Sequence, residues 1–154
     1  MAQTSLQGST VQEKLNKMAV DLISVTPVVS ASGTDAVGEL LFDSIEIPYA
    51  VNEDGGSSIL QSITAFSNDD NKMVMDLLFY QVTQDFGTAG TAITGTMTPA
   101  EANSSVLLGH VSVSDWCILA NADAHVATKT NIGLVLQAAS GSTSIYMAGI
   151  VRSV

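Results

Sequence analysis

The stretch Met73–Val82, MVMDLLFYQV, decides the fold class of this chain. Its alternate positions form two sets, and both sets are apolar. The sets are Met73, Leu77 and Phe79 on one side and Val74, Leu78 and Tyr80 on the other. A strand with one face in water would alternate apolar and polar residues, so this pattern is typical of a strand covered on both faces. We predict that Met73–Val82 lies in the middle of the core.

The run that precedes this strand, Ile59–Phe66, is ambiguous by spacing alone. Ile59, Ile63 and Phe66 also fit the period of a helix. The glycines in front of the run, its Ser and Thr content and the apolar run after SNDDNK favour a strand. We therefore predict a β-hairpin between Ile59–Phe66 and Met73–Val82.

Five further segments carry strand signals and are separated by polar or Gly-rich turns. They are residues 20–30, 39–47, 110–119, 128–139 and 144–154, with 120–127 as a loop. SGST, residues 140–143, should join the last two strands as a terminal hairpin. The count, about seven or eight strands, predicts a mainly all-β chain with an antiparallel β-sandwich or jelly-roll-like architecture.

Two capping boxes predict the helices of the chain. Thr10 and Glu13 open an amphipathic segment in which Val11, Leu15 and Met18 follow at helical spacing. We expect a short N-terminal helix there, within an arm of residues 1–19 that precedes a β-sandwich domain of residues 20–154.

The second capping box lies in TPAEANSSVLLG, residues 98–109. Thr98 is the predicted N-cap, Pro99 the first helical residue and Glu101 the third, and Gly109 stands just past the expected end. One internal helix of about two to three turns is predicted.

Composition excludes several classes of function. Fifteen acidic residues against five basic ones give a formal charge of −10, which repels nucleic-acid phosphates. No apolar run reaches the roughly 18–20 residues that span a bilayer, and the start of the chain lacks the pattern of a signal peptide. We expect neither nucleic acid nor membrane as a partner. The lone Cys117 excludes an internal disulfide.

The acidic loop VNEDGGSS, residues 51–58, is the first candidate for a ligand site. Asn52, Glu53 and Asp54 are consecutive, whereas a helix-loop-helix calcium site needs oxygen ligands at alternate positions and a closing Glu. A calcium site would need acids from elsewhere, for instance Asp69 and Asp70. The loop has no basic residue to hold a phosphate. We predict a solvated turn in which Gly55 or Gly56 supplies a positive φ.

His110, Cys117 and His125 are the soft metal ligands of the chain. Their spacing of seven and eight places His110 and Cys117 on opposite faces of a regular strand, so we predict no shared metal. The neighbours of Cys117, DWCIL, predict a buried and inert thiol. Trp116 is predicted as a core anchor, with an interface position as the alternative.

No arrangement of residues predicts an enzyme. G-x-S-x-G and S-x-x-K motifs are absent, and nothing singles out a pair of carboxylates. We therefore predict no catalytic residues, no cofactor and no metal. The apolar face of Val11, Leu15 and Met18 lacks an obvious partner strand, so it either covers one end of the sandwich or docks on another chain.

Two segments carry a family resemblance: GGSSILQSITAF, residues 55–66, and TNIGLVLQAASGSTSIYMAGIV, residues 130–151. With the order of the runs from Val20 onward, the chain resembles small virion proteins of tailed bacteriophages that look like capsid decoration, or cement, proteins. The motifs are structural and carry no catalytic residue. Residues 1–17 lie outside the resemblance.

The resemblance implies a structural virion protein on the outer capsid surface, made in the host cytoplasm. It would bind the major capsid protein, stabilise capsomer contacts, and assemble with itself as a closed trimer or dimer. The alternative is a tail or head-fibre component that binds host surface carbohydrate.

Overall fold

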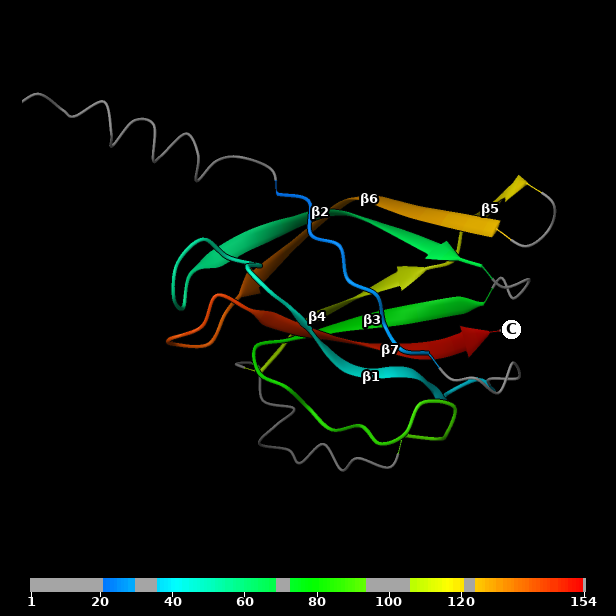
Figure 1. The fold of residues 1–154 in the computed structure, drawn as a ribbon, viewed down its shortest axis with the longest axis horizontal. Helices are drawn as coiled ribbons and strands as arrows, with labels where there is room; N and C mark the ends of the chain where they lie inside the picture. Colours follow the sequence, from blue (N-terminus) through cyan, green and yellow to red (C-terminus); the bar gives the residue numbers. More distant parts are fainter. Residues whose placement is uncertain (1–20, 30–35, 69–72, 94–105, 121–123, 154) are drawn as a thin grey trace, which may run out of the picture.

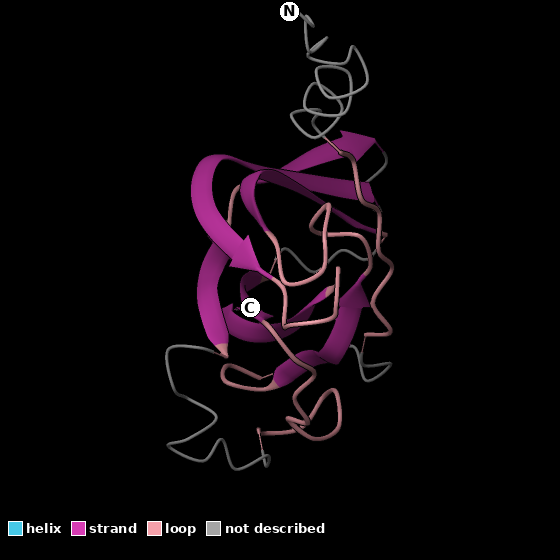
Figure 2. Ribbon diagram, turned by 90° about the vertical axis from the view of Figure 1, so that its left-hand side faces the viewer, coloured by secondary structure: helices cyan, strands magenta, loops and turns pink. Residues whose placement is uncertain are grey.

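The computed structural model describes residues 21–29, 36–68, 73–93, 106–120 and 124–153. Within these ranges the chain is mainly β, as predicted, and contains no helix (Figures 1 and 2). Seven strands form two antiparallel sheets. The strands are β1 (Leu40–Ile47), β2 (Ser57–Ser67), β3 (Val74–Tyr80), β4 (Leu107–Val113), β5 (Trp116–Ala120), β6 (Ala124–Gln137) and β7 (Ile145–Ser153).

The four-stranded sheet has the order β1-β7-β3-β4, and the three-stranded sheet has the order β2-β6-β5. In the view of Figure 1 the three-stranded sheet lies above the four-stranded one. One apolar cluster joins them, since it contains Leu77 and Phe79 of β3 together with Ala127 and Leu136 of β6. The two sheets therefore share a core.

The central position of Met73–Val82 is confirmed. β3 lies between β7 and β4, and its Leu77 and Phe79 are buried in the shared core. On the opposite face Tyr80 is buried in a second cluster with Leu40, Phe86 and Ala148. The Tyr80 and Phe86 rings lie 5.3 Å apart between centroids. Both faces of the strand are covered, which is the physical basis of its uninterrupted apolar pattern.

The predicted hairpin between Ile59–Phe66 and Met73–Val82 is wrong. β2 pairs with β6, whereas β3 pairs with β4 and β7. β3 is covered on both faces, whereas alternate side chains of β2 are exposed. β2 therefore covers one face of β3 from the opposite side of the core. Separate sheets satisfy both strands.

The predicted terminal hairpin is also wrong. The turn at residues 140–143 is present, and the Ser142 N–H donates to the Ala139 carbonyl at 3.0 Å. However, the turn takes the chain from β6 in one sheet to β7 in the other. β7 is buried along most of its length and lies between β1 and β3, so its apolar residues are covered in the larger sheet.

The segment 110–119, predicted as one strand, is divided between the sheets. β4 ends at Val113 and β5 begins at Trp116 in the other sheet. Trp116 is partly buried against the shared core, and its Nε1–H donates to the Met73 carbonyl at 2.9 Å. The prediction of a core anchor is confirmed, and the indole fixes the chain where it changes sheets.

The predicted strand at residues 20–30 is wrong for the described part, 21–29, which pairs with no strand. In Figure 1 this segment, drawn in blue, crosses from β2 toward the four-stranded sheet. Ile23 and Val25 pack against the shared core, while Leu22 and Val28 are exposed. Packing against the core therefore explains the alternation of apolar residues without strand pairing. Pro27 has no N–H to donate to a neighbouring strand.

The helix predictions fall mostly outside the described residues. This holds for residues 11–18 with Val11, Leu15 and Met18, and for Thr98, Pro99 and Glu101. The expected helix end at Gly109 is wrong, because Gly109 lies inside β4. A Cβ there would come within 2.7 Å of the Leu134 side chain, so close packing on β6 explains this glycine.

Candidate functional site

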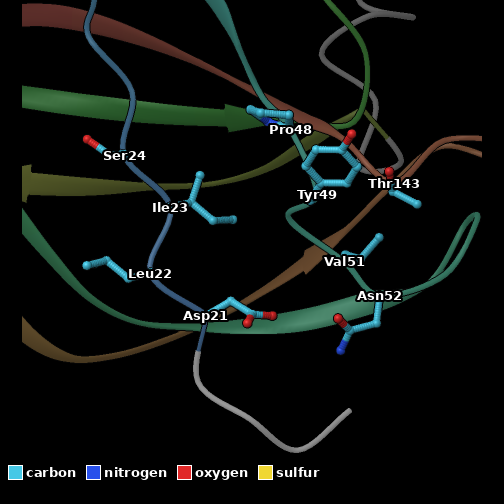
Figure 3. A pocket seen from close by; sticks show the side chains of 9 residues that line it. All are labelled: Asp21, Leu22, Ile23, Ser24, Pro48, Tyr49, Val51, Asn52 and Thr143. Atoms are coloured by element: carbon cyan, nitrogen blue, oxygen red, sulfur yellow. The ribbon is translucent and has the colours of Figure 1, made fainter. Parts of the chain in front are cut away.

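The described part of the chain contains a pocket of about 490 Å³ that is open to solvent. Three segments line it: residues 21–24, the β1–β2 connection, and Thr143 of the β6–β7 connection (Figure 3). The volume lies within the roughly 300–1,000 Å³ that small-ligand sites occupy. The pocket is therefore the first candidate for a binding site.

Hydrogen bonds tie together the segments at the base of this pocket. Val51 is buried, and its N–H donates to the Thr143 carbonyl at 3.1 Å, which ties the two connections together. The Ser58 hydroxyl donates to the Ala50 carbonyl at 2.7 Å. These bonds fix the β1–β2 connection against the start of β2.

Tyr49 stands at the edge of the pocket with its ring directed outward from the chain (Figure 3). It follows Pro48, has a φ of 56° and is 77% exposed. A positive φ is uncommon for a bulky residue and costs conformational energy. The tertiary structure thus holds an exposed aromatic ring in a strained backbone beside an open cavity.

The polar groups of the pocket come from Asp21, Ser24, Asn52 and Thr143. The side chains of Asp21, Ser24 and Thr143 make no hydrogen bond to the rest of the described chain. Ile23 and Val51 contribute apolar surface beside them. The site can offer hydrogen bonds and apolar contact to the same ligand.

A second polar cluster lies on β3 and its neighbours. Asp76 is buried to 7% exposure; it accepts a hydrogen bond from the Arg152 Nε–H at 2.6 Å and another from the Ser112 hydroxyl. Burial alone would raise the pKa of Asp76, but the Ser112 and Arg152 hydrogen bonds and the Arg152 charge outweigh it. The pKa of this carboxyl therefore lies below its usual value of 3.8, and Asp76 is held as an anion.

This cluster is suited to holding β3, β4 and β7 together. The Ser112 hydroxyl donates directly to the carboxylate, so no imidazole stands between the two groups as a nucleophilic serine would require. The sequence shows Asp76 as the one acid in MVMDLLFY, yet the pattern alone does not reveal its partners.

The outer face of the three-stranded sheet, here called the outer sheet face, is exposed and uncharged. It comprises Ser57, Ile59, Ser62, Thr64 and Phe66 of β2 and Thr128, Thr130 and Val135 of β6. Ile59 and Val135 are directly paired and each is 56% exposed, and Phe66 is 73% exposed. Thr64 and Thr128 are paired next to them, with 3.4 Å between hydroxyl oxygens.

The acidic loop forms a turn, as predicted. Gly55 has a φ of +66°, and the Gly56 N–H donates to the Glu53 carbonyl at 2.8 Å. The Gly55 N–H donates to the Ser142 carbonyl at 2.9 Å, so the turn is fixed to the β6–β7 connection. Among the described residues, no three His, Cys, Asp or Glu side chains form a group that could hold a metal ion. Asp69 and Asp70 lie outside that part.

The soft ligands are divided between the two sheets, His110 in the four-stranded sheet and Cys117 and His125 in the three-stranded sheet. His110 is exposed on β4, and His125 is fully buried on β6, which begins at Ala124 within the predicted loop. The prediction of a buried Cys117 is wrong, because this thiol is exposed. β5 is an edge strand, and its register sets Cys117 opposite Val126.

The Tyr49 pocket was not predicted from the sequence. Its lining comes from segments far apart in the chain, and the positive φ of Tyr49 has no sequence signal of the kind that glycine provides. The predicted partner-binding residues Val11, Leu15 and Met18 lie outside the described chain.

The described residues include no helix long and apolar enough to cross a membrane. Comparisons of the chain with family models, with curated proteins and with solved structures find no match. The resemblance to virion proteins of tailed bacteriophages therefore stays a prediction.

Proposed function

We propose that the chain is a structural virion protein of a tailed bacteriophage that binds the outside of the capsid as a decoration, or cement, protein. The outer sheet face is the observation that carries this proposal. It presents Ile59, Phe66 and Val135 on the exposed side of one sheet, and none of the residues that define this face is charged. In a chain with a net charge of −10, such a surface is suited to contact with another protein.

The binding free energy expected for such a contact suits a shell to which many copies bind. Burial of apolar surface contributes about 25 cal/mol per Å², and only the part left after the cost of association appears as affinity. One copy would bind weakly. A copy that bridges two capsomers gains from multivalency, because its second contact forms within an existing complex.

The finer architecture belongs to the same proposal. Two antiparallel sheets with a shared core support a β-sandwich or jelly-roll-like module for residues 20–154. The module assembles as a closed trimer or dimer, and residues 1–19, through Val11, Leu15 and Met18, add to the contact with the major capsid protein. The negative charge favours the exterior of the shell, away from packaged DNA.

Attachment to purified capsids tests the proposal. The double variant Ile59→Asp with Phe66→Asp should reduce occupancy at least tenfold, because two charges would enter the contact. Val28→Asp is the matched control, since Val28 is 86% exposed but lies outside the outer sheet face. Circular dichroism should show that both variants keep the strand content.

Two further outcomes decide the details. Deletion of residues 2–17 should weaken attachment and leave the β module folded. Wild-type occupancy in the double variant would contradict the role of the outer sheet face, and the lack of any capsid binding by the wild-type chain would overturn the proposed function.

A further inference from the structure

The Tyr49 pocket has a feature that packing does not explain. A tyrosine with a φ of 56° carries backbone strain, and glycine or asparagine would adopt this conformation at lower cost. Burial of the ring could compensate, but the ring is 77% exposed. With its ring mostly in water, Tyr49 contributes little buried apolar surface to the fold. Its benefit is the apolar ring face that it displays next to the cavity.

We propose that this pocket binds a neutral saccharide, with Tyr49 as the stacking platform and with Asp21 and Thr143 as hydrogen-bonding groups. A pyranose ring has one face of C–H groups and a rim of hydroxyls. The Tyr49 ring matches the first, and the polar side chains of Asp21 and Thr143 match the second (Figure 3).

The polar groups are suited to hydroxyls in particular. The Asp21 carboxylate offers two acceptor oxygens, while the Thr143 hydroxyl both donates and accepts. Within the described chain these two side chains are not committed to other hydrogen bonds. A sugar hydroxyl, which is donor and acceptor at once, can pair with either type of group. Asn52 adds an amide at the same wall.

Other classes of ligand fit less well. Phosphates and acidic sugars would meet Asp21 in the pocket, Glu53 and Asp54 in the same connection, and a chain charge of −10. A purely apolar ligand would leave the carboxylate and hydroxyls without partners. A metal ion would find one carboxylate, too few for a hard cation. The remaining match is an uncharged polyol with an apolar face.

The openness of the pocket predicts weak binding to a single sugar. Drug-sized ligands gain only a modest free energy per non-hydrogen atom, and a monosaccharide has few atoms, so the expected Kd is about 1 mM. Higher avidity would come from many copies on one particle. The measurement must therefore detect millimolar binding.

Saturation-transfer NMR on the full chain with methyl α-glucoside, methyl α-mannoside, methyl β-galactoside and methyl β-N-acetylglucosaminide meets this need. At least one glycoside should receive saturation at its ring C–H protons. Tyr49→Ala should reduce the signal at least fivefold, and Tyr49→Phe should retain it, since the ring face is kept. Asp21→Asn should weaken binding several-fold. 3′-Sialyllactose, an acidic probe, should bind more weakly than its neutral parent lactose.

Phe66→Ala is the matched control, because Phe66 is equally exposed but lies on the outer sheet face. It should leave saturation transfer unchanged. Failure of all four glycosides with the wild-type chain, or equal transfer in Tyr49→Ala, would overturn the saccharide site. Tyr49→Ala should keep wild-type occupancy on capsids, so the failure of this inference and the failure of the proposed function give different results.

Discussion

The two sheets differ in how their faces are covered. β3 of the four-stranded sheet is buried on both sides, with Phe79 in the shared core and Tyr80 packed against Phe86. β2 of the three-stranded sheet covers the core with one face and exposes Phe66 with the other. The larger sheet therefore buries its central strand on both faces, whereas the smaller sheet leaves one face in water.

Truncation of one phenylalanine in each sheet should show this difference most strongly. Phe79→Ala should lower the free energy of unfolding by about 3–5 kcal/mol, because it removes a buried ring and leaves a cavity. Phe66→Ala should change it by no more than about 0.5 kcal/mol, since the ring is 73% exposed. Urea unfolding followed by circular dichroism measures both. Similar losses in the two variants would contradict the division between the sheets.

Asp76→Asn should have the next largest effect. The change removes the anion that Arg152 and Ser112 hold, and we expect a loss of about 2 kcal/mol at pH 7. Because the folded-state pKa lies below 3.8, this stabilisation is complete above the unfolded pKa of about 4 and is lost as pH falls through the folded value.

Urea titrations of wild type and Asp76→Asn between pH 7 and pH 2.5 would show this. The difference between the two proteins should shrink as the pH falls. Asp115→Asn is the control, since Asp115 is exposed. A difference independent of pH would mean that the Asp76 charge does not hold β3, β4 and β7 together.

Tyr80→Phe should have the smallest effect and the opposite sign. The Tyr80 hydroxyl is buried without a hydrogen-bond partner among the described residues, so its removal should stabilise the fold by up to about 1 kcal/mol. Burial raises the pKa of Tyr80 to about 12 from its usual 10.0. The stability tied to the protonated phenol is present below pH 10 and is lost as pH rises through about 12.

The advantage of Tyr80→Phe should therefore grow from pH 9 to pH 11 in the same unfolding assay. A clear destabilisation by Tyr80→Phe at pH 7 would show that the hydroxyl makes a stabilising contact. It would contradict the prediction that the hydroxyl is buried at a cost.

The residues that were predicted well are those whose pattern is local. Met73–Val82 is predicted as a strand covered on both faces because both alternating sets are apolar. Gly55 is predicted at a turn because glycine tolerates a positive φ. Pairing was predicted badly. Ile59–Phe66 and residues 144–154 were assigned to their neighbours in sequence, whereas β2 pairs with β6 and β7 pairs with β1 and β3.

The same distinction between local and long-range features applies to the candidate sites. The turn at Glu53–Gly56 could be predicted from adjacent residues. The pocket could not, because Asp21, Tyr49 and Thr143 meet only when three segments converge. Cys117 was misplaced because successive strand residues face opposite sides of a sheet, and Trp116 takes the side that faces the core.

The sequence by itself determined that the chain is mainly β, that β3 is central, and that the acidic loop turns, because side-chain alternation and glycine conformation are properties of a few adjacent residues. Only the tertiary structure decided which strands share a sheet, which face stays in water, and where Tyr49 stands beside a cavity. Those features depend on contacts between strands far apart in the chain, because the alternation within one strand fixes which side is apolar but not which strand lies beside it.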